Sequence, residues 1–343
     1  MKILGIETSC DETAASIIEA KGDSIKVVSN VVSSQINIHR KYGGVVPEVA
    51  ARDHIKNILP VIEQALAPLS PRKSDPGVKA LAVTRGPGLI PALIVGLESA
   101  KALAYAWQKP LIGVNHMAGH IYSAWLEQKK LPQFPALILI VSGGHTELIL
   151  MKGHYHFKKI GQTRDDAAGE AFDKVAKTLE LGYPGGPSVA TAATKITSSK
   201  TQIPKIVLPR PMMHDKNFDF SFSGLKTSVL YAVQKDKKWQ QRLSEYCAEF
   251  QQAVIDVLIF KTLKAAEQYK VKSVILAGGV AANLELRKQL GNKIKTELPS
   301  VSFHLPHLKY TTDNAAMIAA AGYFYQQYEK KKNNITVDCN LTF

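Results

Sequence analysis

The feature that most constrains the fold is a structural plan that the chain follows twice. The stretch KILGIETSCDETAASIIEA is typical of two strands joined by a short polar turn, and KALAVTRGPGLIPALIVGLESAKALAYA is typical of a strand, a Gly/Pro turn and a helix. Both units return later, as ALILIVSGGHTELILMKG and KSVILAGGVAANLELRKQL. The repetition predicts a duplicated, two-lobed α/β fold with a cleft between the lobes.

The boundary between the lobes is expected in a polar stretch, EQKKLPQFP, whose two prolines are typical of a linker. We expect a first lobe at residues 1–132 and a second lobe at residues 133–321. Residues from about 160 to 260 are expected to form a largely helical elaboration of the second lobe. Residues 322–343 are expected to pack back on the first lobe through a helix in YFYQQYEKKKNN.

Cysteine usage and hydropathy favour a cytoplasmic protein. The three cysteines, Cys10, Cys247 and Cys339, form no C-x-x-C pair, which argues against a disulfide framework and against a thiolate zinc site. The N-terminal residues contain no apolar run of signal-peptide length, and the most apolar helical stretch carries Glu98 and Lys101. We therefore expect neither export nor a membrane span.

The formal net charge of +14 favours a polyanionic partner, and nucleic acid is the first candidate. The alternative is that the lysine clusters are only solvated surface. The clusters are Lys129-Lys130, Lys158-Lys159, Lys237-Lys238 and Lys330-Lys331-Lys332.

Three glycine-rich turns indicate a bound nucleotide, because backbone N–H groups there can approach phosphate oxygens. They are Ser142-Gly143-Gly144-His145-Thr146, Gly185-Gly186-Pro187 and Gly278-Gly279. None matches the P-loop or the dinucleotide-binding pattern. Each of them taken alone is also compatible with an ordinary tight turn.

Four carboxylates lie close to these turns or to the first hairpin. Asp11 and Glu12 fall in the hairpin turn, and Glu170 and Asp173 are three residues apart on one face of an expected helix. Such groups can hold a ribose, a magnesium ion or a substrate ammonium group. Helix capping and surface solvation are the alternative interpretation.

The stretch HMAGH places His116 and His120 four residues apart, so that both imidazoles can bind one metal if the stretch is helical. A metalloprotease of the H-E-x-x-H type needs a glutamate next to the first histidine, and Met117 stands there instead. Asp313, before an expected helix, offers a third ligand, and the site would then bridge the two expected lobes. A purely structural histidine pair is the alternative.

Ten motifs in order along the chain resemble the bacterial TsaD family, the tRNA N6-adenosine threonylcarbamoyltransferases once described as O-sialoglycoprotein endopeptidases. The motifs are GIETSCDET, YGGVVPEVAARDH, GPGLIPALIVGL, NHMAGH, VSGGHTEL, DDAAGEAFDK, YPGGP, FSFSGLKT, LAGGVAAN and TDNAAMIA. The resemblance implies a two-lobed fold of the actin, Hsp70 and sugar-kinase (ASKHA) type. It also implies transfer of a threonylcarbamoyl group from threonylcarbamoyl-adenylate to N6 of the adenosine 3′ to the anticodon, in tRNAs that read codons beginning with A.

The resemblance also implies roles for individual residues. The metal ligands would be His116, His120 and Asp313, which hold one divalent metal, with iron favoured over zinc. The positions that bind the substrate, an adenylate or ATP-type nucleotide, would be Ile140, Val141, Ser142, Gly143, Gly144, Asp173, Gly186 and Asn283. Removal of the amine proton would fall to Asp11, to Glu12 or to the departing phosphate.

The implied partners are tRNA, a TsaB-like paralogue of the same fold, a TsaE-like ATPase and a separate synthase of the adenylate; a homodimer is left open. Three rival functions stay in view: a metal-dependent endopeptidase, a small-molecule kinase of the same fold and a non-catalytic nucleotide-binding scaffold. Residues 190–207 and the tail NNITVDCNLTF depart from the family pattern, which leaves open how they contact tRNA or partners.

Overall fold

The computed structural model describes residues 1–69, 76–195, 206–329 and 335–343. These residues form two compact units and two five-stranded sheets. Unit 1 comprises Met1–Gln133, Met151–Lys158 and His304–Phe343. Unit 2 comprises Phe134–Leu150 and Lys159–Phe303.

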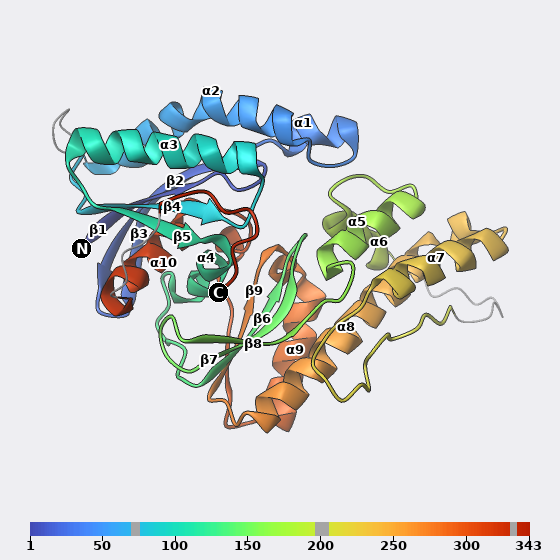
Figure 1. Ribbon diagram of the computed structural model, residues 1–343. Helices are drawn as coiled ribbons and strands as arrows, with labels where there is room; N and C mark the ends of the chain where they lie inside the picture. The colour runs from blue at the N-terminus through green and yellow to red at the C-terminus, as the bar shows by residue number, and fades with distance from the viewer. Residues whose placement is uncertain (70–75, 196–205, 330–334) are drawn as a thin grey trace. The chain divides into compact units, whose positions relative to one another are not determined.

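The sheet of unit 1 has the strand order β3-β2-β1-β4-β5 (Figure 1). β1 pairs antiparallel with β2 and parallel with β4, and β4 pairs parallel with β5. The strands are β1 (Lys2–Glu7), β2 (Glu12–Lys21), β3 (Ser24–Ser34), β4 (Ala80–Gly86) and β5 (Leu111–Asn115). β1 and β4 are buried almost throughout, as is typical of central strands that are covered on both faces.

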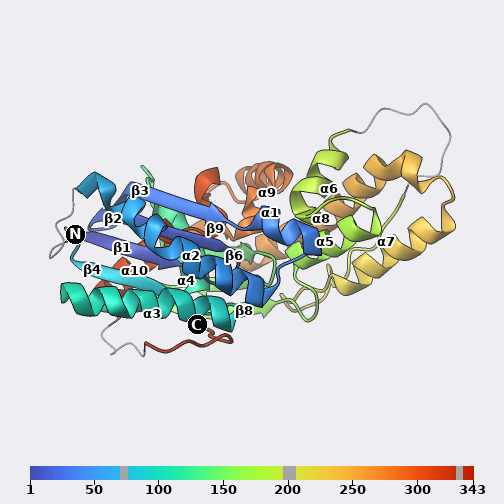
Figure 2. The same ribbon diagram turned by 90° about the horizontal axis from the view of Figure 1, so that it is seen from above.

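Helices cover both faces of this sheet. α2 and α3 lie side by side on one face and α10 lies on the other (Figures 1 and 2). α10 begins with small residues, AAMIAAAG, and reaches β1 closely because a side chain at Gly5 would collide with the backbone of Ala315. The helices of unit 1 are α1 (Ile36–His39), α2 (Pro47–Leu66), α3 (Ile90–Trp107), α4 (His116–Tyr122) and α10 (Ala315–Tyr328).

The sheet of unit 2 repeats this plan with the strand order β10-β9-β6-β7-β8. β6, the counterpart of β1, pairs parallel with β9, the counterpart of β4. The strands are β6 (Ala136–Val141), β7 (Thr146–Met151), β8 (Phe157–Gln162), β9 (Ser273–Ala277) and β10 (Ser302–His304). The predicted duplicated α/β fold of the ASKHA type is therefore confirmed.

Four helices of unit 2 stand between β8 and β9 in the described part of the chain. The long, largely buried α8 packs against β6 and α6. These four are α5 (Ala168–Thr178), α6 (Gly185–Ala193), α7 (Ser223–Lys235) and α8 (Leu243–Gln268), and α9 (Leu284–Glu297) follows β9. Short 3₁₀ helices cover Arg40–Tyr42, Ala67–Leu69, Ser123–Trp125, Trp239–Arg242, Gly279–Ala282 and Leu308–Tyr310.

The division into units differs from the expected lobes at two places. Residues 304–321 were expected in the second lobe but belong to unit 1, because α10 packs against β1, β2, β4 and β5. Residues 151–158, which join β7 to β8, also belong to unit 1, where His154 stacks on Phe324 with ring centroids 4.3 Å apart.

Two sequence expectations fall on residues that the structure does not describe. These are the lysine run 330–332 and most of the atypical stretch 190–207. Across the described ranges, no helix has both the length and the apolar character needed to cross a membrane.

Candidate metal centre and glycine turns

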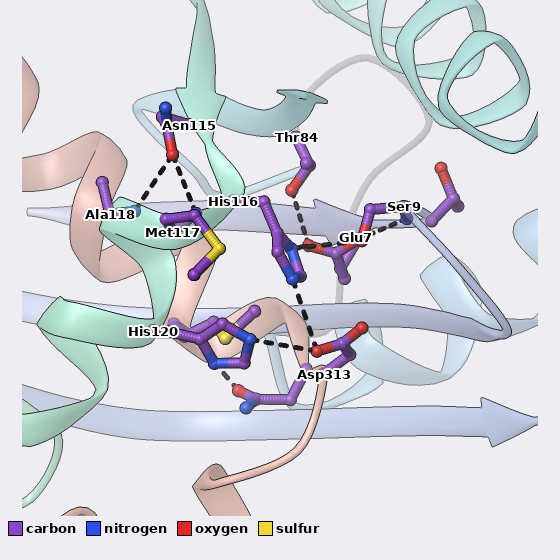
Figure 3. Close-up of polar contacts among 12 residues, drawn as sticks. Glu7, Ser9, Thr84, Asn115, His116, Met117, Ala118, His120 and Asp313 are labelled. Atoms are coloured by element: carbon purple, nitrogen blue, oxygen red, sulfur yellow. Dashed lines mark hydrogen bonds and ion pairs between the residues drawn. The ribbon is translucent and has the colours of Figure 1, made fainter. Parts of the chain in front are cut away.

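The two histidines of HMAGH lie on one short helix, α4, whose start is fixed by Asn115. The side-chain oxygen of Asn115 accepts hydrogen bonds from the backbone N–H groups of Met117 and Ala118, at 2.8 and 3.2 Å, as an N-cap does (Figure 3). His116 is the first helical residue and His120 follows one turn later, with ring centroids 4.7 Å apart. The predicted helical arrangement of the pair is confirmed.

Asp313 lies in the C-terminal segment of unit 1, two residues before α10 begins. Asn314 caps that helix by accepting a hydrogen bond from the N–H of Met317. α10 packs against α4 at Gly119, where a side chain would meet Ile318. The expectation that the site bridges two lobes is therefore wrong: all three side chains belong to unit 1.

The three side chains converge on one point (Figure 3). The same Oδ1 of Asp313 lies 3.5 Å from Nε2 of His116 and 3.3 Å from Nε2 of His120. These distances are longer than the roughly 2.7–2.9 Å of a charge-assisted hydrogen bond. Ligand atoms that each lie about 2.0–2.1 Å from a tetrahedral metal are about 3.3–3.4 Å apart. These two distances fit a shared divalent metal, and the three ligand atoms all lie within 4.8 Å of one another.

Glu7, at the end of β1, orients His116. Its fully buried carboxylate accepts hydrogen bonds from the Nδ1–H of His116 at 3.0 Å, from the hydroxyl of Thr84 at 2.6 Å and from the backbone N–H of Ser9 (Figure 3). Because Nδ1 donates to Glu7, Nε2 is the nitrogen that faces Asp313. A carboxylate behind a ligating histidine is a common outer-shell partner of metal sites.

The sequence interpretation missed Glu7. The signal was a charged residue at the buried end of a strand, which requires a partner inside the protein.

The electrostatics of the group follow from its burial. Burial lowers the pKa of His116, but the negative charges of Asp313 and Glu7 outweigh it and raise the pKa to about 9. Burial raises the pKa of Asp313, but the charge of His116 and the hydrogen bond from His120 lower it to about 2. The pKa of Glu7 is also lowered, because His116 outweighs the effect of burial. The carboxylates are thus held ionised, the form that binds metal, whereas His116 carries a second proton at neutral pH. A metal at Nε2 would displace that proton.

His120 differs from His116 in its second nitrogen. Within the described residues, the buried Nδ1 of His120 has no hydrogen-bond partner. A buried polar atom without a partner costs about 1–3 kcal/mol. A ligating histidine usually has a partner on its second nitrogen, as His116 has in Glu7, so the two rings of the pair differ in this respect.

Asp11 and Glu12 lie beside this group. Asp11 is buried in the turn between β1 and β2, and Glu12 is the first residue of β2. Burial, together with the negative charges of Asp313 and Asp11, raises the pKa of Glu12 well above its usual range. A carboxyl group with a raised pKa is a candidate for proton transfer near neutral pH.

The expected substrate positions in unit 2 begin at the end of β6. The side chains of Ile140 and Val141 lie fully in the core, so only their backbone can meet a ligand. Ser142 closes the turn to β7: its N–H donates to the carbonyl of His145 at 2.8 Å, and its hydroxyl accepts from the N–H of His145 at 3.1 Å. Gly144 lies in this turn, where a Cβ would meet no atom within 4 Å.

Gly185 and Gly186 are adjacent but play different parts. The carboxylate of Asp173 accepts a hydrogen bond from the N–H of Gly185 at 2.7 Å, and a Cβ at Gly185 would lie 2.5 Å from the Cα of Asp173. Gly185 is therefore required for packing. Gly186, like Gly143 and Gly279, has open space where a Cβ would stand.

The remaining expected positions have partners within the protein. The side-chain oxygen of Asn283 caps α9 by accepting from the N–H of Leu286, and its amide donates to Gln251 at 2.8 Å. Glu170 forms an ion pair with Lys174 at 2.8 Å on the surface, which supports the solvated-surface interpretation for this residue.

Comparison with known proteins assigns the family. A family model described as "TsaD: tRNA N6-adenosine threonylcarbamoyltransferase" matches residues 26–320. A tRNA N6-adenosine threonylcarbamoyltransferase from Dehalococcoides mccartyi is 50% identical over 324 residues, covering 94% of this chain and 93% of that protein. The enzyme of the same description from Geobacillus kaustophilus is 50% identical over 341 residues, covering 98% and 95%.

Solved structures agree with the fold. HypF from T. kodakarensis matches with a TM-score of 0.63 at 14% identity, over 95% of this chain and 48% of that one. Full-length HypF in a phosphate- and nucleotide-bound form matches with a TM-score of 0.57 at 13% identity, over 96% and 56%. With the paired histidines, the aspartate and the ten ordered motifs in place, the sequence matches leave one conclusion: the chain belongs to the TsaD family of tRNA N6-adenosine threonylcarbamoyltransferases.

Proposed function

We propose that this protein transfers a threonylcarbamoyl group to N6 of the adenosine 3′ to the anticodon, in tRNAs that read codons beginning with A. The observation that carries the proposal is the match to curated transferases over nearly the whole length of both chains. The protein would work in the cytoplasm, where its tRNA substrate is found.

The proposed donor is threonylcarbamoyl-adenylate, a mixed carbamic–phosphoric anhydride. N6 of the adenosine forms a bond to the carbamoyl carbon, the bond from that carbon to the phosphate oxygen breaks, and AMP leaves with the electron pair. The proton of N6 passes to a base. Because AMP is already a good leaving group, positioning of the two substrates supplies most of the rate enhancement. In favourable cases positioning lowers the activation barrier by about 7–11 kcal/mol.

The glycine turns of unit 2 would hold the adenylate. Gly143, Gly144, Gly186 and Gly279 have no atom within 4 Å of a built Cβ, so packing does not explain why they are glycine. Backbone N–H groups without side chains can approach phosphate oxygens there. Asp173 would act by holding the Gly185 turn, and Asn283 by fixing the start of α9 next to Gly279.

His116, His120 and Asp313 would hold one divalent metal, which we propose to be Fe(II), with Zn(II) as the alternative. Two histidines and one carboxylate suit both ions. When bound, the metal supplies a Lewis acid or a template for the carbamoyl group or the threonyl part. Glu7 fixes the tautomer of His116, and Asn115 and Asn314 fix the starts of the two helices that present the ligands.

Asp11 or Glu12 would take the proton from N6, unless the departing phosphate does so. Glu12 is partly exposed and its pKa is raised, which suits a base that works near neutral pH. Asp11 is the more buried of the two.

A metal-dependent endopeptidase is disfavoured by the same helix. Met117 occupies the position of the general base, is buried, and carries a thioether that cannot accept a proton from water. A small-molecule kinase of this fold would have no use for the histidine pair.

The proposed partners are tRNA, a TsaB-like paralogue, a TsaE-like ATPase and a separate synthase of the adenylate, while a homodimer is the alternative to the pairing with the paralogue. The net charge of +14 supports binding of tRNA. The neighbouring helices α2 and α3 support a protein partner, because they expose large apolar side chains. These side chains are Ile55, Leu59, Ile90, Ile94 and Tyr105, of which Tyr105 is 88% exposed.

The test is reconstitution with purified components: this protein, its partners, tRNA, threonine, bicarbonate, ATP and the synthase. Mass spectrometry of the digested tRNA is expected to show threonylcarbamoyladenosine only when this protein is present. His116→Ala is expected to abolish the product while tRNA binding is retained, and the exposed His307→Ala serves as the matched control. Unmodified tRNA from the complete mixture would count against the proposed function.

A further inference from the structure

A second buried polar group in unit 1 has no part in the chemistry described so far. It consists of four side chains, Thr13, Gln35, His39 and His54, all fully buried. They come from β2, from the segment after β3, from α1 and from α2. Buried polar side chains are costly unless every donor and acceptor is satisfied.

The hydrogen bonds of His39 fix its tautomer. Its Nδ1 lies 3.3 Å from the backbone N–H of Val46 and must accept that hydrogen bond. The proton of His39 therefore sits on Nε2, which donates to the side-chain oxygen of Gln35 at 3.0 Å. The amide nitrogen of Gln35 in turn donates to the carbonyl of Ala50 at 3.3 Å.

The tautomer of His54 follows in the same way. Its Nε2 lies 3.0 Å from the carbonyl oxygen of Cys10, which can only accept, so Nε2 carries the proton. Its Nδ1 then accepts from the hydroxyl of Thr13 at 2.7 Å and from the amide of Gln35 at 3.4 Å. Both histidines are neutral Nε2–H tautomers. Burial, which lowers the pKa of His54, acts in the same direction.

The group ends on the turn that carries the two candidate bases. The carbonyl of Cys10 accepts from His54, and the carbonyl of Asp11 accepts from the backbone N–H of Gln35 at 2.9 Å. Two consecutive carbonyls of one turn are thus held by one connected set of buried groups. The carboxylates of Asp11 and Glu12, the two candidate bases, belong to this same turn and to the first residue of β2.

We propose that His54 is a positioning residue, which holds the Cys10–Glu12 turn in the place that proton transfer to Asp11 or Glu12 requires, with Thr13 fixing its imidazole. The inference rests on the proposed transferase and on the role of the turn in it. A shift of the turn by about 1 Å is expected to lower the rate by up to about 100-fold, because reacting groups must be in near-attack positions. No ligand atom of the candidate metal centre lies in the Cys10–Glu12 turn, so we expect metal binding to change little when the turn shifts.

The test compares two replacements of His54 that each keep one half of the imidazole's hydrogen bonding. The amide nitrogen of His54→Gln can replace the Nε2 donor to Cys10, whereas His54→Asn keeps an acceptor near Nδ1 and loses that donor. We expect His54→Asn to lower kcat by about 10- to 100-fold. The KM for tRNA and the metal affinity stay within about twofold, and His54→Gln retains a kcat within about threefold.

His304→Asn is the matched control, because it removes another buried histidine outside the proposed sites. Wild-type kcat in His54→Asn, or an equal fall of kcat in both His54 variants and the control, would overturn the proposal. If His54→Asn does not fold, Thr13→Val and Thr13→Ser replace it. Thr13→Val is expected to lower kcat and Thr13→Ser to restore it, since only serine keeps the hydroxyl donor.

Two further measurements separate this inference from the proposed function. Inactivity of the wild-type protein would count against the transferase itself, whereas full activity of both Asp11→Asn and Glu12→Gln would overturn only the role of the turn. Long-range ¹H–¹⁵N NMR of the imidazoles is expected to find His39 and His54 as Nε2–H tautomers at about pH 7. An Nδ1–H tautomer or a charged ring at His54 would contradict the hydrogen-bond directions derived above.

Discussion

Replacement of Glu7 by glutamine tests how the candidate metal centre is built. Glutamine has the shape of glutamate but carries no charge. Its amide NH₂ group is a hydrogen-bond donor, and it would face three other donors that all require an acceptor. The N–H groups of Ser9 and His116 and the hydroxyl of Thr84 all point at this carboxylate. We expect His116 to lose its fixed orientation while Asp313 and His120 remain in place.

The expected losses of metal affinity and of folding free energy follow from the burial of Glu7. Loss of an outer-shell partner lowers metal affinity by about 10- to 100-fold, which corresponds to about 1.4–2.7 kcal/mol of binding free energy. Removing one member of a buried ion pair costs about 3–5 kcal/mol of folding free energy. Glu7→Gln is therefore expected to lower the melting temperature of the metal-free protein as well.

The assay is a competition titration of the metal-free protein with Zn(II) or Co(II) against a chelator of known affinity. Glu19→Gln is the matched control, because Glu19 lies on the neighbouring strand β2 with its side chain exposed. The control is expected to bind metal as the wild type does. If Glu7→Gln bound metal within about twofold of the control, the orienting role of Glu7 would be refuted.

Four further outcomes are expected. Gly186→Ala is expected to keep the melting temperature but to weaken adenylate binding in calorimetry. Gly185→Ala is expected to unfold at a lower temperature, because its Cβ would meet Asp173. An equal fall of the melting temperature in both variants would contradict the open space at Gly186. Asp165 accepts hydrogen bonds from the segment Ser221–Ser223, which outweigh burial and lower its pKa. Ionised Asp165 contributes about 1 kcal/mol to the free energy of unfolding, a figure discounted for its exposure. This contribution is present above about pH 4 and is lost as the pH falls through the folded-state pKa of Asp165. In melting curves recorded at acid pH, Asp165→Asn should therefore not show this loss of stability. Tyr105→Glu, on α3, is expected to abolish binding of the TsaB-like partner in gel filtration without changing the melting temperature, and unchanged binding would exclude this face. Binding of tRNA is expected to weaken at least about tenfold between about 50 and 200 mM salt. An affinity that does not change with salt would show that the basic side chains do not bind the tRNA phosphates.

Local patterns in the sequence predicted much of this architecture. The two strand–turn–strand units became β1–β2 and β6–β7, because alternating and continuous apolar runs specify strands that are buried on one or both faces. The spacing of His116 and His120 placed both rings on one helical face, as i and i+4 residues must lie. Residue types and spacing suggested His116, His120 and Asp313 as one ligand set, the resemblance implied the same set, and the structure brings these side chains together.

Long-range packing was not predictable from such patterns. α10 follows β10 in sequence but packs on β1, because its small residues fit against Gly5, and this placed Asp313 in unit 1 instead of the expected second lobe. Glu7 was missed for a similar reason. Its three hydrogen-bond donors come from the adjacent turn, β4 and α4, and no spacing in the sequence connects them.

The central claim is that the metal held by His116, His120 and Asp313 is required for transfer to tRNA. The most direct measurement is a single-turnover assay in which labelled threonylcarbamoyl-adenylate and tRNA meet metal-free protein that has been reloaded in steps, with its partners present. We predict that the transfer rate rises in proportion to bound metal and saturates at one ion per chain, and that Asp313→Ala shows no such rise. A full transfer rate in the metal-free protein would contradict the claim.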